Sequence, residues 1–114
     1  MAEQDVHTKH EHGIAWITID RPEVMNAFRG QTVDLLIAAF RGAMHDREVG
    51  VVVLTGAGDR AFSTGGDQKA RTDDGYGDGS GIGLDMHGLH GIMRAIPKPV
   101  IAMVNGYAIG GGHV

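Results

Sequence analysis

Two short apolar segments, each followed at once by glycine, constrain the fold of this chain more than any other feature. Val51 to Thr55 (VVVLT) is closed by Gly56, and Val100 to Val104 (VIAMV) is closed by Asn105-Gly106. Continuous apolar runs of this length are typical of strands that are buried on both faces, as in parallel sheets covered by helices. We therefore expect both segments to be buried strands of a parallel sheet.

The rest of the chain alternates between strand and helix patterns around these two segments. Ile14 to Asp20 (IAWITID) alternates apolar and polar residues, as a half-buried strand does. From Thr32 to about Asp46, and again from Leu84 to Ile96, apolar residues recur at spacings of three and four, which predicts two amphipathic helices. Strand, helix, strand, helix, strand is the order of an α/β fold with right-handed crossovers.

Composition and charge favour one domain and exclude several classes of protein. The chain has 114 residues, a formal net charge of -4 and no cysteine, and its Lys and Arg residues are scattered. A nucleic-acid binder would carry a basic stripe, and a membrane span would need about 18 consecutive apolar residues. We expect a cytoplasmic protein that binds neither nucleic acid nor a membrane, with no disulfide and no Cys-based zinc site.

Both ends of the chain lack the pattern of a regular element. The N-terminal segment that contains His7, His10 and His12 is interpreted as polar and frayed. At the other end, Tyr107 to Val114 (YAIGGGHV) leads from a strand into a glycine-rich turn where a helix should begin. A parallel sheet needs helices over both faces. We expect residues 1–114 to be the N-terminal part of a single domain of a longer protein.

The two glycine clusters, GAGDRAFSTGGD and NGYAIGGG, each follow a predicted buried strand. Ligands of open α/β sheets bind at the carboxyl ends of strands. Because glycine has no Cβ, backbone N–H groups in such turns can approach one point, and two of them form an oxyanion hole. A helix beginning at the second cluster would favour an anion there. Ordinary strand-to-helix turns explain the spacing more simply, and both interpretations stay open.

Three segments of the chain together resemble the N-terminal signatures of the enoyl-CoA hydratase/isomerase (crotonase) superfamily. They are RPEVMNAF at Arg21 to Phe28, VVVLTGAGDRAFSTGGDQ at Val51 to Gln68 and IPKPVIAMVNGYAIGGG at Ile96 to Gly112, in the family's order. The resemblance implies an α/β fold with a ββα spiral core, of which this chain holds the N-terminal part, and homo-trimers or hexamers. It also implies that the backbone amides of Gly66 and Gly111 stabilise the enolate of an acyl-CoA thioester.

Within the superfamily, GGDQ at Gly65 to Gln68 resembles two groups that make or break a carbon–carbon bond beside a thioester. The 2-ketocyclohexanecarboxyl-CoA hydrolases open a ring, and they are favoured by MNAFRG at Met25 to Gly30, by TGGDQ at Thr64 to Gln68 and by the segment Gly83 to Ala102. The 1,4-dihydroxy-2-naphthoyl-CoA synthases close a ring, and they are favoured by QKAR at Gln68 to Arg71 and GGGHV at Gly110 to Val114. We expect the hydrolase.

The position of Val114 bears on a third activity, hydration of an enoyl-CoA. The simple hydratases that this chain resembles carry a glutamate where Val114 stands, so one of their two catalytic carboxylates is missing here. Hydratase activity in the broad sense stays an alternative. No cofactor is expected beyond the coenzyme A of the substrate, except that the synthase alternative implies bicarbonate.

The resemblance gives the long glycine-rich segment a role in the site. Phe62 to Gln68 would shape the oxyanion hole and the acyl pocket, and Lys69 to Gly83 would form a mobile lid. Within the lid, Tyr76 would donate to the acyl group or the enolate, a flexible surface tyrosine being the alternative. The expected substrate and CoA contacts are Arg29, Thr64, Gly65, Asp67, Gln68, Lys69, Arg71, Tyr107, Ala108, Ile109 and Gly110.

The charged residues in this set have two interpretations each. Arg29, Lys69 and Arg71 are candidate cations for the CoA phosphates, and solvated surface charges are equally open. Asp67 beside Gly66 is a candidate general base, although a role in capping or bracing the loop is the preferred interpretation.

Two further patterns are set aside. His87 and His90 lie three apart on a predicted helix, but no clear third ligand accompanies them, so no metal site is expected. GDGSGIG at Gly77 to Gly83 resembles a dinucleotide fingerprint, but it does not directly follow a strand.

Two classes of function remain: an acyl-CoA enzyme that uses Gly66 and Gly111, or a non-catalytic assembly or binding protein, or inactive fragment, with the same fold. Binding and turnover of a CoA thioester discriminate between them.

Overall fold

The computed structural model describes residues 4–67 and 85–114. The strands in these ranges are β1 (Val6–Glu11), β2 (Ile14–Ile19), β3 (Val51–Gly56), β4 (Ala61–Ser63), β5 (Val100–Ala102) and β6 (Tyr107–Ala108). The helices are α1 (Gly30–His45) and α2 (Met86–Ala95), and the 3₁₀ helices are η1 (Pro22–Val24) and η2 (Gly110–Gly112).

Four strands form one mixed sheet in the order β1-β2-β3-β5. β1 is antiparallel to β2, whereas β2, β3 and β5 run parallel to one another. β4 and β6 form a separate parallel pair. The predicted parallel arrangement of the three strands is confirmed.

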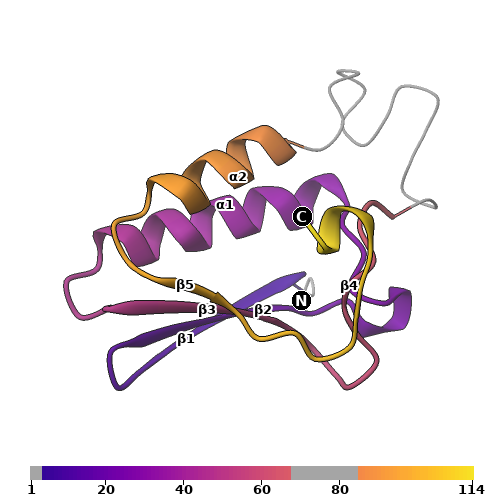
Figure 1. Cartoon of the computed structure of the whole chain (residues 1–114), viewed down its shortest axis with the longest axis horizontal. Coiled ribbons are helices and arrows are strands. Elements are labelled where there is room, and N and C mark those ends of the chain that lie inside the picture. The colour runs from indigo at the N-terminus through magenta and orange to yellow at the C-terminus, as the bar shows by residue number, and fades with distance from the viewer. Residues whose placement is uncertain (1–3, 68–84) are drawn as a thin grey trace.

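Both helices lie side by side on the same face of the four-stranded sheet (Figure 1). The residues of β2 alternate between buried and half-buried, so its buried side faces the helices. The main core between the layers consists of aliphatic and aromatic side chains, among them Ala15, Ile17, Ile19, Val33, Leu36, Phe40, Val52 and Leu54. Neither helix in the described ranges is long and apolar enough to cross a bilayer.

The interpretation of the N-terminal segment as frayed is wrong, because residues Val6–Glu11 form the regular edge strand β1. His12 and Gly13 join it to β2 with φ angles of 54° and 80°. Two consecutive residues with positive φ make the tight turn that matches the twist of an antiparallel pair. Most of β1 is exposed, and polar side chains at a sheet edge discourage pairing with another chain.

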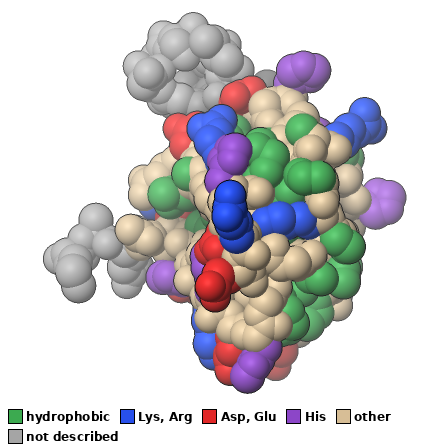
Figure 2. All heavy atoms as spheres, turned by 90° about the vertical axis from the view of Figure 1, so that its left-hand side faces the viewer, with side chains coloured by type: hydrophobic (Ala, Val, Ile, Leu, Met, Phe, Trp, Pro, Cys, Tyr) green, Lys and Arg blue, Asp and Glu red, His purple; other side chains and the backbone are tan. Residues whose placement is uncertain are grey.

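The prediction that Val100 to Val104 forms a buried strand is wrong about the burial. β5 ends at Ala102, and Ile101 and Met103 are 50% and 45% exposed. β5 is the edge of the sheet in the described residues, so fewer neighbours cover it than cover β3. Figure 2 shows hydrophobic side chains gathered along one side of the molecule. The large exposed hydrophobic residues are Ile101, Met103, Val104, Tyr107, Ile109 and Val114.

Candidate active site

The two glycine turns are brought together by the short parallel pair of β4 and β6. Ala61 pairs with Tyr107 and Ser63 pairs with Ala108. The Ile109 amide donates to the Ser63 carbonyl at 3.0 Å. Because the strands are parallel, the turns that follow them lie at the same end of the pair. Sequence patterns did not predict either strand, since each is too short to show a periodicity.

Glycine is required where these turns meet. Gly65 and Gly110 have φ angles of +88° and +57°, which L side chains rarely adopt. A Cβ on Gly65 would lie 3.0 Å from the Gly111 amide nitrogen, and a Cβ on Gly112 would collide with the Ser63 carbonyl oxygen. The two backbone segments are therefore in direct contact, with no room for side chains between them.

The direction of the Gly66 N–H is set by a hydrogen bond to the Gly65 carbonyl, which belongs to the same peptide group. Gly66 forms a parallel bridge with Phe28: the Phe28 N–H donates to the Gly65 carbonyl, and the Asp67 N–H donates to the Phe28 carbonyl, both at 2.7 Å. In a trans peptide the C=O and N–H groups point in opposite directions. The Gly65 carbonyl points to Phe28, so the Gly66 N–H points away from it.

Two neighbouring amides therefore remain for a ligand. No residue in the described ranges accepts a hydrogen bond from Gly66 N–H or from Gly111 N–H, whereas Gly65 N–H donates to the Ser63 hydroxyl at 3.2 Å. Gly111 lies in the first turn of η2, where amides lack a partner within the helix. The residues where a helix was expected to begin form the 3₁₀ turn η2, and the Val114 N–H donates to the Gly110 carbonyl at 3.2 Å, the spacing of an α-helix.

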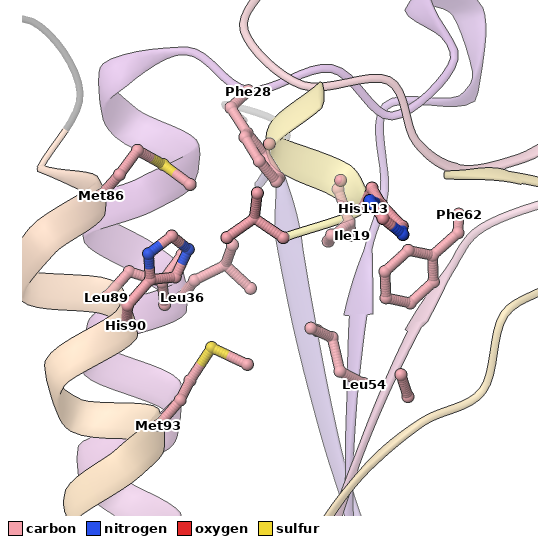
Figure 3. Close-up of a pocket in the computed structure, with 14 residues that line it drawn as sticks. Ile19, Phe28, Leu36, Leu54, Phe62, Met86, Leu89, His90, Met93 and His113 are labelled. Atoms are coloured by element: carbon pink, nitrogen blue, oxygen red, sulfur yellow. The ribbon is translucent and has the colours of Figure 1, made fainter. Parts of the chain in front are cut away.

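An apolar cavity of about 100 Å³ lies between α2 and the sheet. Figure 3 shows Met86, His90 and Met93 of α2 on one side of this cavity and Phe62 and Leu54 on the other. The lining residues are Ile19, Phe28, Leu36, Leu54, Phe62, Met86, Leu89, His90, Met93, Ala102, Gly111, Gly112, His113 and Val114. One of the two glycines of the candidate oxyanion hole thus lines a space suited to an apolar group.

Two asparagines that sequence reasoning missed hold the loop before β4. Asn26 is fully buried, and its Nδ2 donates to the carbonyls of Ala57 and Ala61 at 3.0 and 2.8 Å. Asn105 Nδ2 donates to the carbonyls of Gly56 and Gly58 at 2.8 and 2.9 Å. The resembling motifs contain both residues, as VMNAF and VNGYA. The available signal was a single polar carboxamide among mostly apolar residues in each motif.

A chain of charges runs from the N-terminal segment to the first glycine turn. The Asp5 carboxylate accepts hydrogen bonds from Arg29 Nε and Nη2, both at 2.8 Å, and from the Thr32 hydroxyl at 2.6 Å. Next to it, Arg21 Nη1 lies 3.0 Å from Asp67 Oδ2. Burial raises the pKa of Asp5, but the hydrogen bonds and positive charges of its partners outweigh this and hold the pKa below its ordinary value of 3.8. Asp5 is therefore ionised at neutral pH.

The remaining predicted contacts within the described ranges lie around the same turns. The Thr64 hydroxyl donates to the Met25 carbonyl at 3.3 Å. Tyr107 and Ile109 are 63% and 53% exposed, and Ala108 is half-buried. Their roles in binding, and that of Arg29, which pairs with Asp5 here, stay predictions.

Four predicted residues, Gln68, Lys69, Arg71 and Tyr76, lie outside the described residues, as does the predicted lid. Among the described residues there is no group of three or more His, Asp or Glu side chains that could hold a metal ion. His90 lines the apolar cavity instead.

Comparisons with known proteins agree with the resemblance. The family model described as Enoyl-CoA hydratase/isomerase matches residues 9–114. An enoyl-CoA hydratase from Mycobacterium avium subsp. paratuberculosis is 30% identical, with a TM-score of 0.82 over 98% of this chain and 43% of the other. A carnitinyl-CoA hydratase from Mycobacterium avium is 37% identical, with a TM-score of 0.80 over 97% of this chain and 42% of the other.

A third solved structure is described as an enoyl-CoA hydratase/carnithine racemase from Magnetospirillum magneticum. It is 33% identical, with a TM-score of 0.86 over 97% of this chain and 42% of the other. The chain thus spans less than half the length of each of these three proteins.

Proposed function

Because this chain belongs to the enoyl-CoA hydratase/isomerase family, we propose that it acts on an acyl-CoA thioester through the backbone amides of Gly66 and Gly111. The observation that carries this proposal is that the parallel pair β4 and β6 sets two glycine turns side by side, each with an amide that no described residue engages. The crotonase fold predicted from the sequence is confirmed by the solved structures that this chain resembles.

The chemistry needs donors at the point where negative charge develops. When a proton leaves the carbon next to a thioester, or when a bond to that carbon breaks, the electron pair moves onto the thioester oxygen as an enolate. Fixed amides bind that oxygen more strongly in the transition state than in the ground state, which is what accelerates a reaction. The apolar cavity beside Gly111 would receive the acyl group.

The specific reaction that we propose is the ring opening of 2-ketocyclohexanecarboxyl-CoA to pimeloyl-CoA. Water adds to the ring ketone, and the bond from that carbon to the carbon beside the thioester breaks. The bonding pair becomes the thioester enolate, which is then protonated, while the former ketone becomes a carboxylic acid. The support is the sequence of Met25 to Gly30 and of Gly83 to Ala102.

Two alternatives use the same pair of amides. In the synthase reaction a base removes a proton beside the thioester before the ring closes, with bicarbonate as the implied cofactor. In the hydratase reaction water adds to an enoyl-CoA, and the names of the compared proteins favour this activity. Val114 stands against the hydratase, because an alkyl side chain cannot transfer a proton.

The proposal extends to the substrate's other contacts. Lys69 and Arg71 would bind the CoA phosphates, Tyr76 would assist at the acyl group, and Arg29 would join them if its guanidinium serves both a phosphate and Asp5. We also propose a cytoplasmic homo-trimer or hexamer, with no cofactor other than the coenzyme A of the substrate in the hydrolase reaction.

The test removes each of the two N–H groups in turn by substitution with proline, in the protein that the cell produces. Gly66→Pro and Gly111→Pro should each lower kcat by about 100- to 1000-fold, because proline has no N–H to donate. Gly30→Pro is the matched control: it places the same residue at the first position of α1, where proline is favoured, after Arg29 in an extended conformation. It should keep near-native activity.

The substrates decide among the reactions. The ring ketone thioester, the succinylbenzoyl-CoA precursor of naphthoate and a short enoyl-CoA are supplied separately, and turnover of only the second or third would overturn the hydrolase proposal. Binding of all three without turnover would favour a non-catalytic binding protein. Near-native activity of Gly66→Pro would remove that amide from the site.

A further inference from the structure

The segment that carries the Gly66 amide is anchored by a buried ion pair. Asp67 follows Gly66 directly, and its Oδ2 lies 3.0 Å from Arg21 Nη1, with side-chain exposures of only 8% and 11%. The same Arg21 nitrogen donates to the Ala27 carbonyl at 2.8 Å. One guanidinium group therefore ties Asp67 to the backbone just before Phe28.

Phe28 is the residue against which Gly66 is aligned. Its N–H holds the Gly65 carbonyl and its carbonyl holds the Asp67 N–H. Asp67 is thus fixed twice, once by its own amide and once by its carboxylate through Arg21. The Gly66 N–H belongs to the peptide group between Gly65 and Gly66. A shift of Asp67 would therefore change the direction in which this N–H points.

Arg21 is itself held in place on the opposite side. Its main-chain N–H donates to Asn26 Oδ1 at 2.9 Å, and its Nε lies 3.8 Å from Asp5 Oδ2. Asp5 is bound in turn by Arg29 and Thr32 at the start of α1. The ion pairs therefore connect the first turn of a core helix to the candidate oxyanion hole.

We propose that Arg21 and Asp67 are positioning residues that set the direction of the Gly66 amide. The proposal rests on the proposed function of that amide, and it gives Asp67, which the sequence placed among the expected substrate contacts, a role through Gly66 instead. A displacement of about 1 Å can cost about 100-fold in rate. Loss of the pair should therefore slow the reaction while the remaining contacts still hold the substrate.

The first experiment measures steady-state kinetics of Asp67→Asn and Arg21→Gln in the protein as the cell makes it. Each should lower kcat by about 10- to 100-fold and change KM by less than about threefold. If the two residues act as a unit, the double variant should be no slower than the slower single variant. Lys98→Met is the control, because it removes two half-buried hydrogen bonds at the far end of α1 and should keep the native kcat.

The second experiment measures amide hydrogen exchange, which does not depend on turnover. In Asp67→Asn and Arg21→Gln the amides of Phe28 and Asp67 should exchange at least about tenfold faster. In Lys98→Met they should not change. If Asp67→Asn fails to fold, Arg21→Lys, which keeps the charge on a less rigid group, replaces it in both experiments.

Each result bears on one proposal. Kinetics and exchange within twofold of the native protein would overturn the positioning role even if Gly66→Pro is inactive. An equal loss of kcat in Lys98→Met would show a general effect of stability and would also overturn it. If Gly66→Pro is fully active, the proposed function fails, and faster exchange at Phe28 and Asp67 would still support the bracing of this segment.

Discussion

At Gly112 the backbone of the second glycine turn meets the carbonyl of Ser63 with no space for a side chain. The obstructing atoms are backbone of β4, so rotation of a side chain cannot relieve the contact. Gly112→Ala should therefore separate β4 from η2 and lower the free energy of unfolding by about 1–3 kcal/mol. Chemical denaturation monitored by circular dichroism measures this change.

Gly42 is the matched control for this prediction. It lies in the exposed part of α1, and a Cβ there would meet nothing within 4 Å. Because alanine is a better helix former than glycine, Gly42→Ala should raise the free energy of unfolding by about 0.5–1 kcal/mol. Equal effects of the two substitutions would contradict the close contact at Gly112.

At the scale of elements, Lys98 connects the C-terminal end of α1 to the segment that precedes β5. Its Nζ donates to the carbonyls of Ala43 and Asp46 at 2.7 and 2.8 Å. Each carbonyl also accepts one backbone N–H, from Asp46 at 3.4 Å and from Val49 at 3.1 Å, so Lys98 adds a second and charged donor at the C-terminus of the helix. Lys98→Met should lower the free energy of unfolding by about 1–3 kcal/mol. Protection of the amides in the last turn of α1 should fall first in hydrogen exchange, and an unchanged profile would contradict the cap.

Sequence patterns predicted the elements that are long or periodic. The observed ranges lie within a few residues of the predicted ones for β2, α1, β3 and α2. The side chains of β2, α1 and α2 follow the period of a half-buried strand or helix, and β3 is a continuous apolar run. β1 was missed because an exposed edge strand needs no apolar face. β5 was predicted as more buried than it is, because an apolar run does not reveal how many neighbours a strand has.

At the scale of the whole molecule, Asp5 couples folding to pH. Its pKa is below the ordinary value of 3.8 in the folded protein, because hydrogen bonds and positive charges from Arg29, Thr32 and Arg21 outweigh the effect of burial. A carboxyl whose folded pKa is depressed contributes stability above its unfolded pKa and loses it as pH falls through the folded pKa. The contribution should be complete at neutral pH and decline below about pH 3.8.

Asp5→Asn tests this coupling. It should lower the free energy of unfolding by about 2 kcal/mol at neutral pH, where charged hydrogen bonds are lost. The difference from the native protein should shrink as the pH falls below 3.8. Asp34→Asn removes an exposed carboxylate of α1 and should change stability by less than about 0.5 kcal/mol. A difference for Asp5→Asn that stays constant down to low pH would refute the assignment.

The site was predictable only in part. Glycine clusters after strands and the family resemblance pointed to Gly66 and Gly111, because motifs record backbone turns well. Sequence patterns did not identify the polar residues that hold those turns in place. Asp5 binds Arg29, and Asn105 binds the loop after β3, and in both cases the partners are far apart in the sequence. Local patterns carry no information on which distant polar groups will pair.

The pairing of β4 with β6 has a consequence for the order in which the molecule folds. It joins segments far apart along the chain, and Phe62 of β4 and Ala108 of β6 pack against the same core as the four-stranded sheet. Contacts between distant segments form slowly in folding, whereas the antiparallel pair of β1 and β2 is local. The corner around Gly66 and Gly111 should therefore assemble late, after the pairing of β1 with β2.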